Sequence, residues 1–344
     1  MSAVLDGLAV PVVAAPMAGG PSTPQLARAV SGAGALGFLG GALLSLDGLA
    51  AEVAAMGTGL TFGVNLFMPT EESYVDLSEH LAALDEWATR YGVQRGEPSY
   101  SDDQYPQKLA WLIEHPVPVV SFTFGCPDAA AIAALQGAGS EVWVTVSSVV
   151  DACTATAAGA DALVVQGFEA GGHRGTFTNV GEPENIGLLA LLRLVHDAVA
   201  LPLLAAGGLI TGADVAAVLV AGARAAQLGT AFLRCPEAGT SAPHRAAVAS
   251  STATATTRAF SGRPARGVRN AWLDELGPAA PAAYPQLNNA SKPIRAAAKV
   301  AGDDAAMSLW AGQTHALSRE MPAAELVATL LAEARVALGA VSLG

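Results

Sequence analysis

The sequence predicts an α/β protein: a (β/α)8 TIM barrel with a small, mostly helical second domain. Three observations support this fold class. Eight short β-branched runs alternate with helical patterns rich in Ala and Leu. The runs are apolar on both faces, as strands of a buried parallel sheet are. Two long stretches differ in composition from this repeat. A doubly wound open sheet is the alternative, but eight βα units favour the barrel.

The expected strands leave room for a helix between each pair. Helical patterns such as those over 23–34 and 185–199 fill these gaps, and most begin at a capping-type residue or Pro and end near Gly. The expected strands span 10–17, 36–40, 62–67, 117–124, 141–146, 162–167, 201–208 and 224–233.

Two regions fall outside the repeat. Residues 69–116 are too many for a single crossover helix, and their YGVQRGEPSYSDDQYP portion is polar and turn-rich, so we expect a loop over the barrel mouth. Residues 235–302 are rich in Ser, Thr, Pro and Arg and are expected to form the small helical domain that covers the substrate. The predicted barrel domain, which binds the cofactor, then comprises 1–234 and 303–344.

Composition narrows the possible partners. With 344 residues, 52% of them hydrophobic, the chain can bury a large core. A net charge of −12 disfavours nucleic acid and anionic lipid as partners. Three scattered cysteines predict neither a disulfide framework nor a metal site. The low cysteine count favours a reducing, cytoplasmic setting. The N-terminus has no basic segment before its apolar run, so neither export nor a membrane span is expected. The expected oligomeric state is a monomer or homodimer.

Polar and glycine residues gather where the expected strands end. In a parallel barrel these carboxyl ends form the functional rim. Five of six notable strand ends contain Gly, which lets the backbone pass close to a flat or phosphorylated ligand. Asn65, Gln166 and Gln227 lie in otherwise apolar strands, where an amide without a partner would be costly. These features predict a ligand at this rim.

The last two strands predict a phosphate site. Gly207 and Gly208 follow the seventh strand, and Gly229 and Thr230 end the eighth, where barrels bind phosphate through backbone N–H groups. A phosphate there and amides nearer the axis suit flavin mononucleotide (FMN). No G-x-G-x-x-G follows the first strand, so a dinucleotide fold has little support.

His173 is the candidate catalytic residue. It stands on the glycine-rich loop EAGGHRG after the sixth strand, and an imidazole can accept or donate a proton near neutral pH. Arg174 either binds an anion or pairs with Glu169 or another carboxylate. Cys126 follows the fourth strand, and packing is the favoured role over a thiolate nucleophile. The other histidines are expected to be surface or core residues: His80, His115, His196, His244 and His315.

Taken together, these motifs resemble the nitronate monooxygenase family, formerly called 2-nitropropane dioxygenases, in its bacterial class. The matching segments occur in family order along almost the whole chain, and only the region around 70–115 lacks a firm match. As a set they are highly specific. They are APMAGG, GVNLF, VSFTFGCP, QGFEAGGHRG, LLAAGGL, AQLGTAF, AFSGRPARG and LWAGQ.

The resemblance implies a barrel that holds FMN without a covalent bond. It implies His173 as the active-site histidine. A substrate-lining Tyr-x3-Tyr-x3-Lys pattern of the family corresponds here to Tyr284, Asn288 and Lys292, so the middle tyrosine is replaced. Including neighbours within the same motifs, the predicted cofactor residues are Met17, Gly19, Gly20, Asn65, Gln166, Gly171, Gly172, Gly207, Gly208, Gln227, Leu228, Gly229 and Thr230.

The implied reaction is oxidation of an alkyl nitronate by O2 to a carbonyl compound and nitrite. His173 would hydrogen-bond or protonate the nitro oxygens and, if nitroalkanes are accepted, remove the α-proton; Lys292 would attract the anion. The alternatives are NADH-dependent flavin reductases, either enoyl-acyl carrier protein reductase-like or NADH:quinone reductase-like, and a flavin-binding module without catalysis. An IMP dehydrogenase-like enzyme fits poorly, because no Cys lies in the loop after the sixth strand to act as its nucleophile.

Overall fold

The computed structural model describes residues 2–182 and 184–340. Eight parallel strands form one sheet in the order β1-β9-β8-β6-β5-β4-β3-β2, and a bridge between Val13 and Leu36 brings β1 and β2 together. Each strand lies within one of the expected runs, so the predicted (β/α)8 barrel is confirmed. The strands are β1 (Val12–Ala14), β2 (Gly37–Gly40), β3 (Phe62–Phe67), β4 (Val119–Thr123), β5 (Glu141–Val146), β6 (Ala162–Gln166), β8 (Leu203–Ala206) and β9 (Ala225–Leu228).

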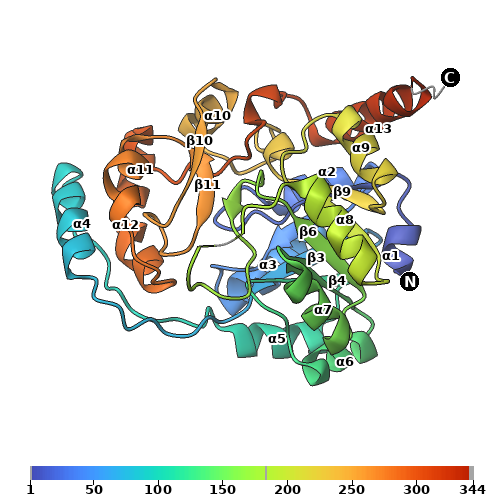
Figure 1. Cartoon of the computed structure of the whole chain (residues 1–344), viewed down its shortest axis with the longest axis horizontal. Helices are drawn as coiled ribbons and strands as arrows, with labels where there is room; N and C mark the ends of the chain where they lie inside the picture. The colour runs from blue at the N-terminus through green and yellow to red at the C-terminus, as the bar shows by residue number, and fades with distance from the viewer. Residues whose placement is uncertain (1, 183, 341–344) are drawn as a thin grey trace.

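Helices surround this sheet (Figure 1). Most of the barrel helices begin at a Ser, Thr or Asp whose side chain caps the helix. Thr23 caps α2 through a bond from Leu26 N, and Thr211 forms a capping box with Asp214 at the start of α9. The C-terminal helix α13 (Ala323–Gly339) packs on α9 and α2. The barrel helices are α2 (Pro24–Gly32), α3 (Leu46–Met56), α5 (Tyr105–Glu114), α6 (Ala129–Ala138), α7 (Val149–Ala158), α8 (Leu188–Ala198) and α9 (Gly212–Val220).

The barrel is filled with apolar side chains at its amino-terminal end. Phe38, Trp143 and Leu204 belong to this inner cluster, and Leu5 of the short helix α1 (Ala3–Asp6) joins it. Glu141 fixes α1 by accepting bonds from Val4 N and Ser2 Oγ. Because this end is packed with side chains, a ligand has room only at the opposite, carboxyl-terminal rim.

Residues 69–116 form more than a loop. They include α4 (Ser78–Arg90), which packs against α12 (Gln286–Ala301) at the side of the molecule farthest from α13, and two extended stretches connect α4 to the barrel (Figure 1). Leu84 and Trp87 of α4 share a hydrophobic cluster with Trp272 and Ile294. The segment therefore adds a helix to this hydrophobic cluster, and its residues 69–70 and 101–103 line a cavity at the barrel rim, so the expected loop at the mouth is present as well.

The chain after β9 contains helices and a small sheet. The helices are α10 (Ala242–Ala249), α11 (Ala271–Leu276) and α12, with 3-10 turns η1 (Thr230–Phe232), η2 (Gly277–Ala279), η3 (Asp304–Ala306) and η4 (His315–Leu317). The antiparallel sheet has the order β10-β11-β7, formed by β10 (Thr254–Thr257), β11 (Ala265–Val268) and β7 (Gly172–His173). The domain limits 235–302 and 303–344 stay a prediction, and residues 341–344 lie outside the described part.

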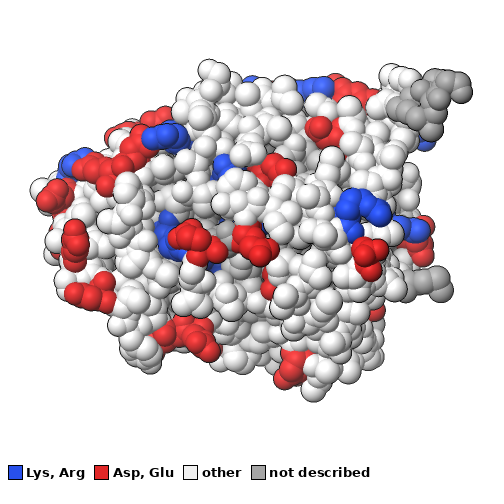
Figure 2. Space-filling model, in the orientation of Figure 1, with Lys and Arg blue, Asp and Glu red and all other residues white. Residues whose placement is uncertain are grey.

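Few charged side chains stand on the face of the molecule drawn in Figure 2. Figure 2 shows mostly uncharged residues, with acidic side chains scattered singly or in small groups among fewer basic ones. None of the helices in the described ranges is both long and apolar enough to cross a membrane.

Candidate active site

Two adjoining cavities open at the carboxyl-terminal rim of the barrel. The inner cavity, of about 300 Å³, is lined by strand ends and by the segment 308–314. The outer cavity, of about 420 Å³, lies between the barrel rim and α12. Of the predicted site, the inner cavity is lined by Met17, Gly19, Asn65, Gln166, Gly171, Gly172, His173, Gly207, Gly208, Gln227, Gly229, Thr230 and Asn288.

Four predicted residues lie elsewhere. Gly20 adopts a positive φ of 127° in the turn after β1 and is not part of either lining. The Leu228 side chain is only 1% exposed and packs in the hydrophobic core of the barrel. Tyr284 and Lys292 line the outer cavity. The structure therefore brings most of the predicted cofactor residues together in one cavity.

The three strand amides differ in their availability to a ligand. Asn65 Nδ2 donates to Ser121 Oγ at 2.9 Å and to Thr123 Oγ1 at 3.1 Å. Gln166 Nε2 donates to His173 O at 2.9 Å, and its Oε1 accepts from Gly175 N at 2.8 Å, so this amide braces the His173 loop. The Gln227 amide lines the inner cavity and has no hydrogen-bond partner within the described residues. Gln227 is thus free to bind a polar ligand edge.

Glycine turns form another part of the cavity wall, at the end of β8 between the strands that carry Gln166 and Gln227. Gly207 and Gly208 have φ values of 122° and 69°, a region that favours glycine. Gly208 O accepts from Thr314 Oγ1 at 2.8 Å, and Thr230 Oγ1 accepts from Gly312 N at 3.0 Å. These bonds connect the predicted phosphate residues to the segment that begins at Trp310.

His173 is positioned by the small sheet. It pairs with Ala265 of β11, so the SGRPARG segment determines where the imidazole lies. Its Nε2 is 2.8 Å from Ser261 Oγ. The ring packs against three aromatic rings, with centroid distances of 5.6 Å to Phe124, 6.0 Å to Tyr284 and 5.4 Å to Trp310. This arrangement fixes the ring while one side of it lines the inner cavity.

The environment of His173 disfavours its charged form. Burial, with additional repulsion from Arg263 and Arg295, lowers the pKa of His173 to about 3. The imidazole is therefore neutral at pH 7. A neutral ring can donate or accept a hydrogen bond but is a weak base.

Arg263 holds both Phe124 and the loop that follows His173 in place. Its guanidinium carbon lies 3.9 Å from the centroid of Phe124, which has an unusual positive φ of 77° at the end of β4. Arg263 is fully buried and donates to Arg174 O and Thr176 O. The residue thus ties the His173 loop to the strand end that places Phe124.

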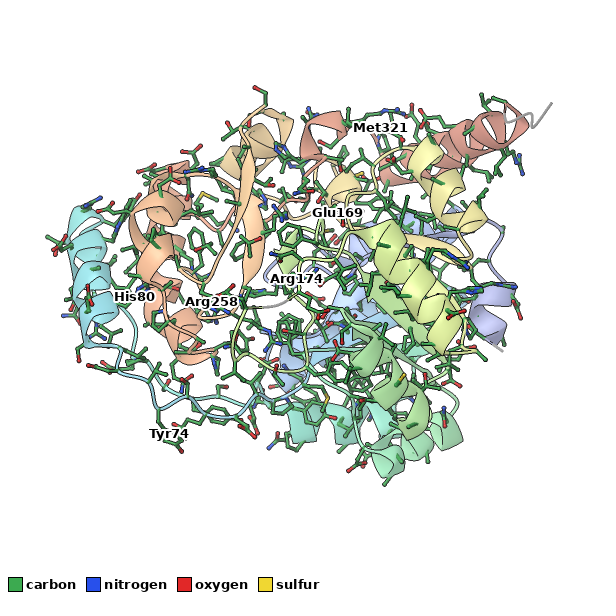
Figure 3. The ribbon with its side chains drawn as sticks, viewed as in Figure 1. Tyr74, His80, Glu169, Arg174, Arg258 and Met321 are labelled. Atoms are coloured by element: carbon green, nitrogen blue, oxygen red, sulfur yellow. The ribbon has the colours of Figure 1, made fainter. Side chains whose placement is uncertain are left out.

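Arg174 is a buried structural residue. Its Nη1 donates to Gly167 O at 2.6 Å, and no carboxylate pairs with it in the described ranges. Glu169 instead accepts from Leu188 N at the start of α8. Figure 3 shows Arg174 and Glu169 where the barrel meets β11. Of the two roles left open, the ion pair is absent within the described residues, and for anion binding the structure shows only that Arg174 lines neither of the two cavities.

Cys126 behaves as a packing residue. It contacts two hydrophobic clusters, and burial raises the pKa of its thiol to about 11. The thiol is therefore protonated at neutral pH, which agrees with the favoured packing role. No group of three or more potential His, Cys, Asp or Glu metal ligands occurs within residues 2–182 and 184–340.

Several residues of the site were not predicted. Ser261, Arg263 and Trp310 lie inside the SGRPARG and LWAGQ motifs, but nothing local to them indicated contact with His173. His244 was expected to be an ordinary histidine, yet it lines both cavities. Arg295 also lines both cavities, one turn after the predicted Lys292.

His173 and His244 together predict a pH dependence of stability. His244 Nε2 donates to Trp310 O at 3.0 Å, and the pKa of His244 is lowered to about 4, chiefly by burial. In the unfolded chain both rings titrate near pH 6.5. Below about pH 6.5 the unfolded chain takes up protons that the folded chain does not, so stability is lost as pH falls towards 4.

His244→Gln tests this prediction, because a Gln amide can still donate to Trp310 O. Thermal unfolding of both proteins between pH 7.5 and 4.5 is expected to give a shallower loss of Tm in the variant. Parallel curves would show that His244 is not responsible for the pH dependence.

Comparison with known proteins identifies the family. A family model described as nitronate monooxygenase matches residues 2–333. A nitronate monooxygenase from Paraburkholderia phytofirmans is 40% identical over 343 residues, which cover 95% of this chain and 92% of that protein. A nitroalkane oxidase from Streptomyces ansochromogenes is 48% identical, with a TM-score of 0.97, over 99% of this chain and 100% of that chain.

A more distant solved structure has the same fold. FabK from Thermotoga maritima is 27% identical, with a TM-score of 0.73, and the match covers 98% of this chain and 97% of that chain. The family match and the full-length identity to a bacterial nitronate monooxygenase agree with the resemblance inferred from the motifs. The chain therefore belongs to the nitronate monooxygenase family and is an enzyme.

Proposed function

We propose that the protein holds FMN in the inner cavity and oxidises alkyl nitronates with O2 to a carbonyl compound and nitrite. The observation that supports this most strongly is a neutral His173, fixed by three aromatic rings, on the wall of a cavity made of glycine turns and strand amides. Cytoplasmic location and a monomeric or homodimeric state remain predictions.

The residues of the inner cavity fit a flavin. Gln227 has a free amide that can donate and accept hydrogen bonds at the polar edge of a planar ring. Asn65 adds an acceptor there, because its Oδ1 makes no bond within the described residues. Gly207, Gly208 and Gly229 leave room for a phosphate close to the backbone. When bound there, FMN would supply the electron-transfer and O2 chemistry.

His173 would orient the nitro group of the substrate. If the Ser261 hydroxyl donates to Nε2, the hydrogen of the neutral ring is on Nδ1, which has no partner in the described part of the chain. Nδ1 could then donate to a nitronate oxygen as charge shifts during the reaction. The surrounding Phe124, Tyr284 and Trp310 would keep water away from this bond.

We propose that substrate reaches the flavin through the outer cavity. Tyr284 and Lys292 line it, and Asn288 lies on the wall shared with the inner cavity. Asn288 replaces the middle tyrosine of the family pattern, and its Oδ1 accepts from Arg295 at 2.8 Å. The smaller side chain leaves more room between the two cavities than a tyrosine would.

The low basicity of His173 predicts a preference for nitronates over nitroalkanes. A nitronate has already lost the α-proton, whereas a nitroalkane must give this proton to a base, and a ring with a pKa of about 3 accepts it poorly. We expect kcat/KM at pH 7 to be at least about 100-fold higher for ethyl nitronate than for nitroethane. Oxygen consumption and nitrite release in air measure both substrates, and equal values would contradict this account of His173.

Anaerobic reduction distinguishes the proposed function from the NADH-dependent alternatives. The protein is purified with its flavin and mixed, without O2, with ethyl nitronate or with NADH. We expect nitronate to bleach the visible flavin absorbance and NADH to leave it unchanged. Rapid bleaching by NADH alone would favour a flavin reductase, and colour without turnover on either would favour a binding module.

A further inference from the structure

The inner cavity has one formally charged side chain among the described residues that line it, Arg295. Its two other titratable groups, His173 and His244, have pKa values lowered to about 3 and about 4. Both imidazoles are neutral at pH 7. An anion that enters this cavity therefore meets a single compensating charge.

All hydrogen-bond partners of Arg295 are neutral. Nε donates to Ser291 Oγ at 3.0 Å, and Nη2 donates to Asn288 Oδ1 at 2.8 Å and to Asn288 O at 3.0 Å. Nη1 has only a long contact of 3.5 Å to Ser308 Oγ. No carboxylate forms an ion pair with Arg295 in the described ranges. The Nη1 group is thus the least satisfied part of a cation that remains protonated at pH 7.

Arg295 differs in its surroundings from the structural arginines nearby. Arg174 and Arg263 are almost completely enclosed, at 1% and 0% exposure, and neither lines the inner or the outer cavity. Arg295 is only partly buried and lies on the wall common to both cavities. Its position suits contact with a ligand that passes from one cavity to the other.

Lys292 and Lys299 lie on the same helix and line only the outer cavity. Both are exposed, so water screens their charges. They would contribute to attraction of an anion. The partly desolvated guanidinium of Arg295 can offer its Nη1 N–H groups to an anion, while Ser291 and Asn288 hold Nε and Nη2 in place. The spacing of 292, 295 and 299 places the three cations along one face of α12.

We propose that Arg295 binds the anionic oxygens of the substrate and so determines the selection of anionic nitronates over neutral nitroalkanes. This inference deepens the proposed function and rests on it for the identity of the substrate. It transfers to Arg295 the main anion-binding role that the sequence suggested for Lys292.

Arg295→Gln tests the proposal, with Arg335→Gln as a control that makes the same substitution at an exposed position of α13, outside both cavities. Loss of a partly desolvated charge pair is expected to reduce kcat/KM for ethyl nitronate by about 30-fold or more, mainly through KM. For neutral nitroethane we expect a change below about threefold. The control is expected to change neither value by more than about twofold.

Sodium nitrate, a planar monoanion that is not turned over, separates anion binding from the proposed reaction. Its Kd is measured in the flavin-loaded protein by calorimetry. We expect Arg295→Gln to raise this Kd by about 30-fold or more. The effect on nitrate binding does not depend on whether nitronate is the substrate. Failure of the anion-binding role of Arg295 can therefore be distinguished from failure of the proposed function.

Arg295→Lys covers the case in which the Gln variant does not fold, as judged by Tm. It keeps the charge but loses the planar fork, so we expect a nitrate Kd raised by about three- to tenfold. An unchanged nitrate Kd in either folded variant, or no nitrate binding by the parent protein, would overturn the proposal. Loss of flavin from a folded variant would also overturn it, because it would assign Arg295 to the cofactor phosphate.

Discussion

Replacing His173 with Asn is expected to lower kcat for ethyl nitronate by about 10²- to 10⁴-fold while FMN stays bound. The imidazole is part of the inner cavity wall, but the groups proposed to hold the flavin are backbone turns and the amides of Asn65 and Gln227. Asn is smaller than His and keeps a polar end, so the fold should tolerate it. Steady-state kinetics with nitronate and flavin absorbance per protein measure the two effects separately.

His196→Asn is the matched control. His196 is an exposed residue of α8 and lines neither cavity, so the same substitution there should leave kcat and Tm unchanged. If His173→Asn retained kcat/KM for both nitronate and nitroethane, His173 would have no part in the reaction.

The second large effect is expected for Gly171→Ala. A methyl group at this position would lie 2.5 Å from both Ala311 C and Gly312 N, and backbone atoms cannot move away as a flexible side chain can. The His173 loop and the segment that begins at Trp310 would separate. We expect the free energy of unfolding to fall by about 2 kcal/mol or more, with loss of most activity.

Gly137→Ala gives the same change in an open position. Gly137 is an exposed residue of α6, and a methyl group there meets no atom within 4 Å. It should raise the free energy of unfolding by about 0.5–1 kcal/mol, because Ala favours a helix. Urea unfolding of both variants measures these opposite shifts, and an undisturbed Gly171→Ala protein would show that the two segments are not tightly packed.

Local patterns were sufficient to predict the barrel. Strands such as Phe62–Phe67 and Glu141–Val146 are short apolar runs bounded by turn residues, and Thr23, Asp128 and Thr211 stand where helices begin. The rim could be predicted as well, because parallel strands all end on the same side. That is why most of the predicted cofactor residues share one cavity.

The parts that depend on distant contacts could not be predicted in the same way. The strand β7 is two residues long, Gly172–His173, and exists only because β11 lies beside it. The position of α4 depends on packing against α12, about 200 residues later in the chain. Local sequence shows that Lys292 and Arg295 are both basic, but not that only Arg295 lines the inner cavity.

The central claim is that the inner cavity binds the isoalloxazine ring of FMN beside His173. A crystal structure of the flavin-loaded protein tests this most directly. The account predicts a tricyclic ring between the strand amides and the glycine turns, with its phosphate near Gly208 and Thr230 and the His173 ring facing it. Density for the ring outside this cavity, or an imidazole turned away from it, would contradict the account.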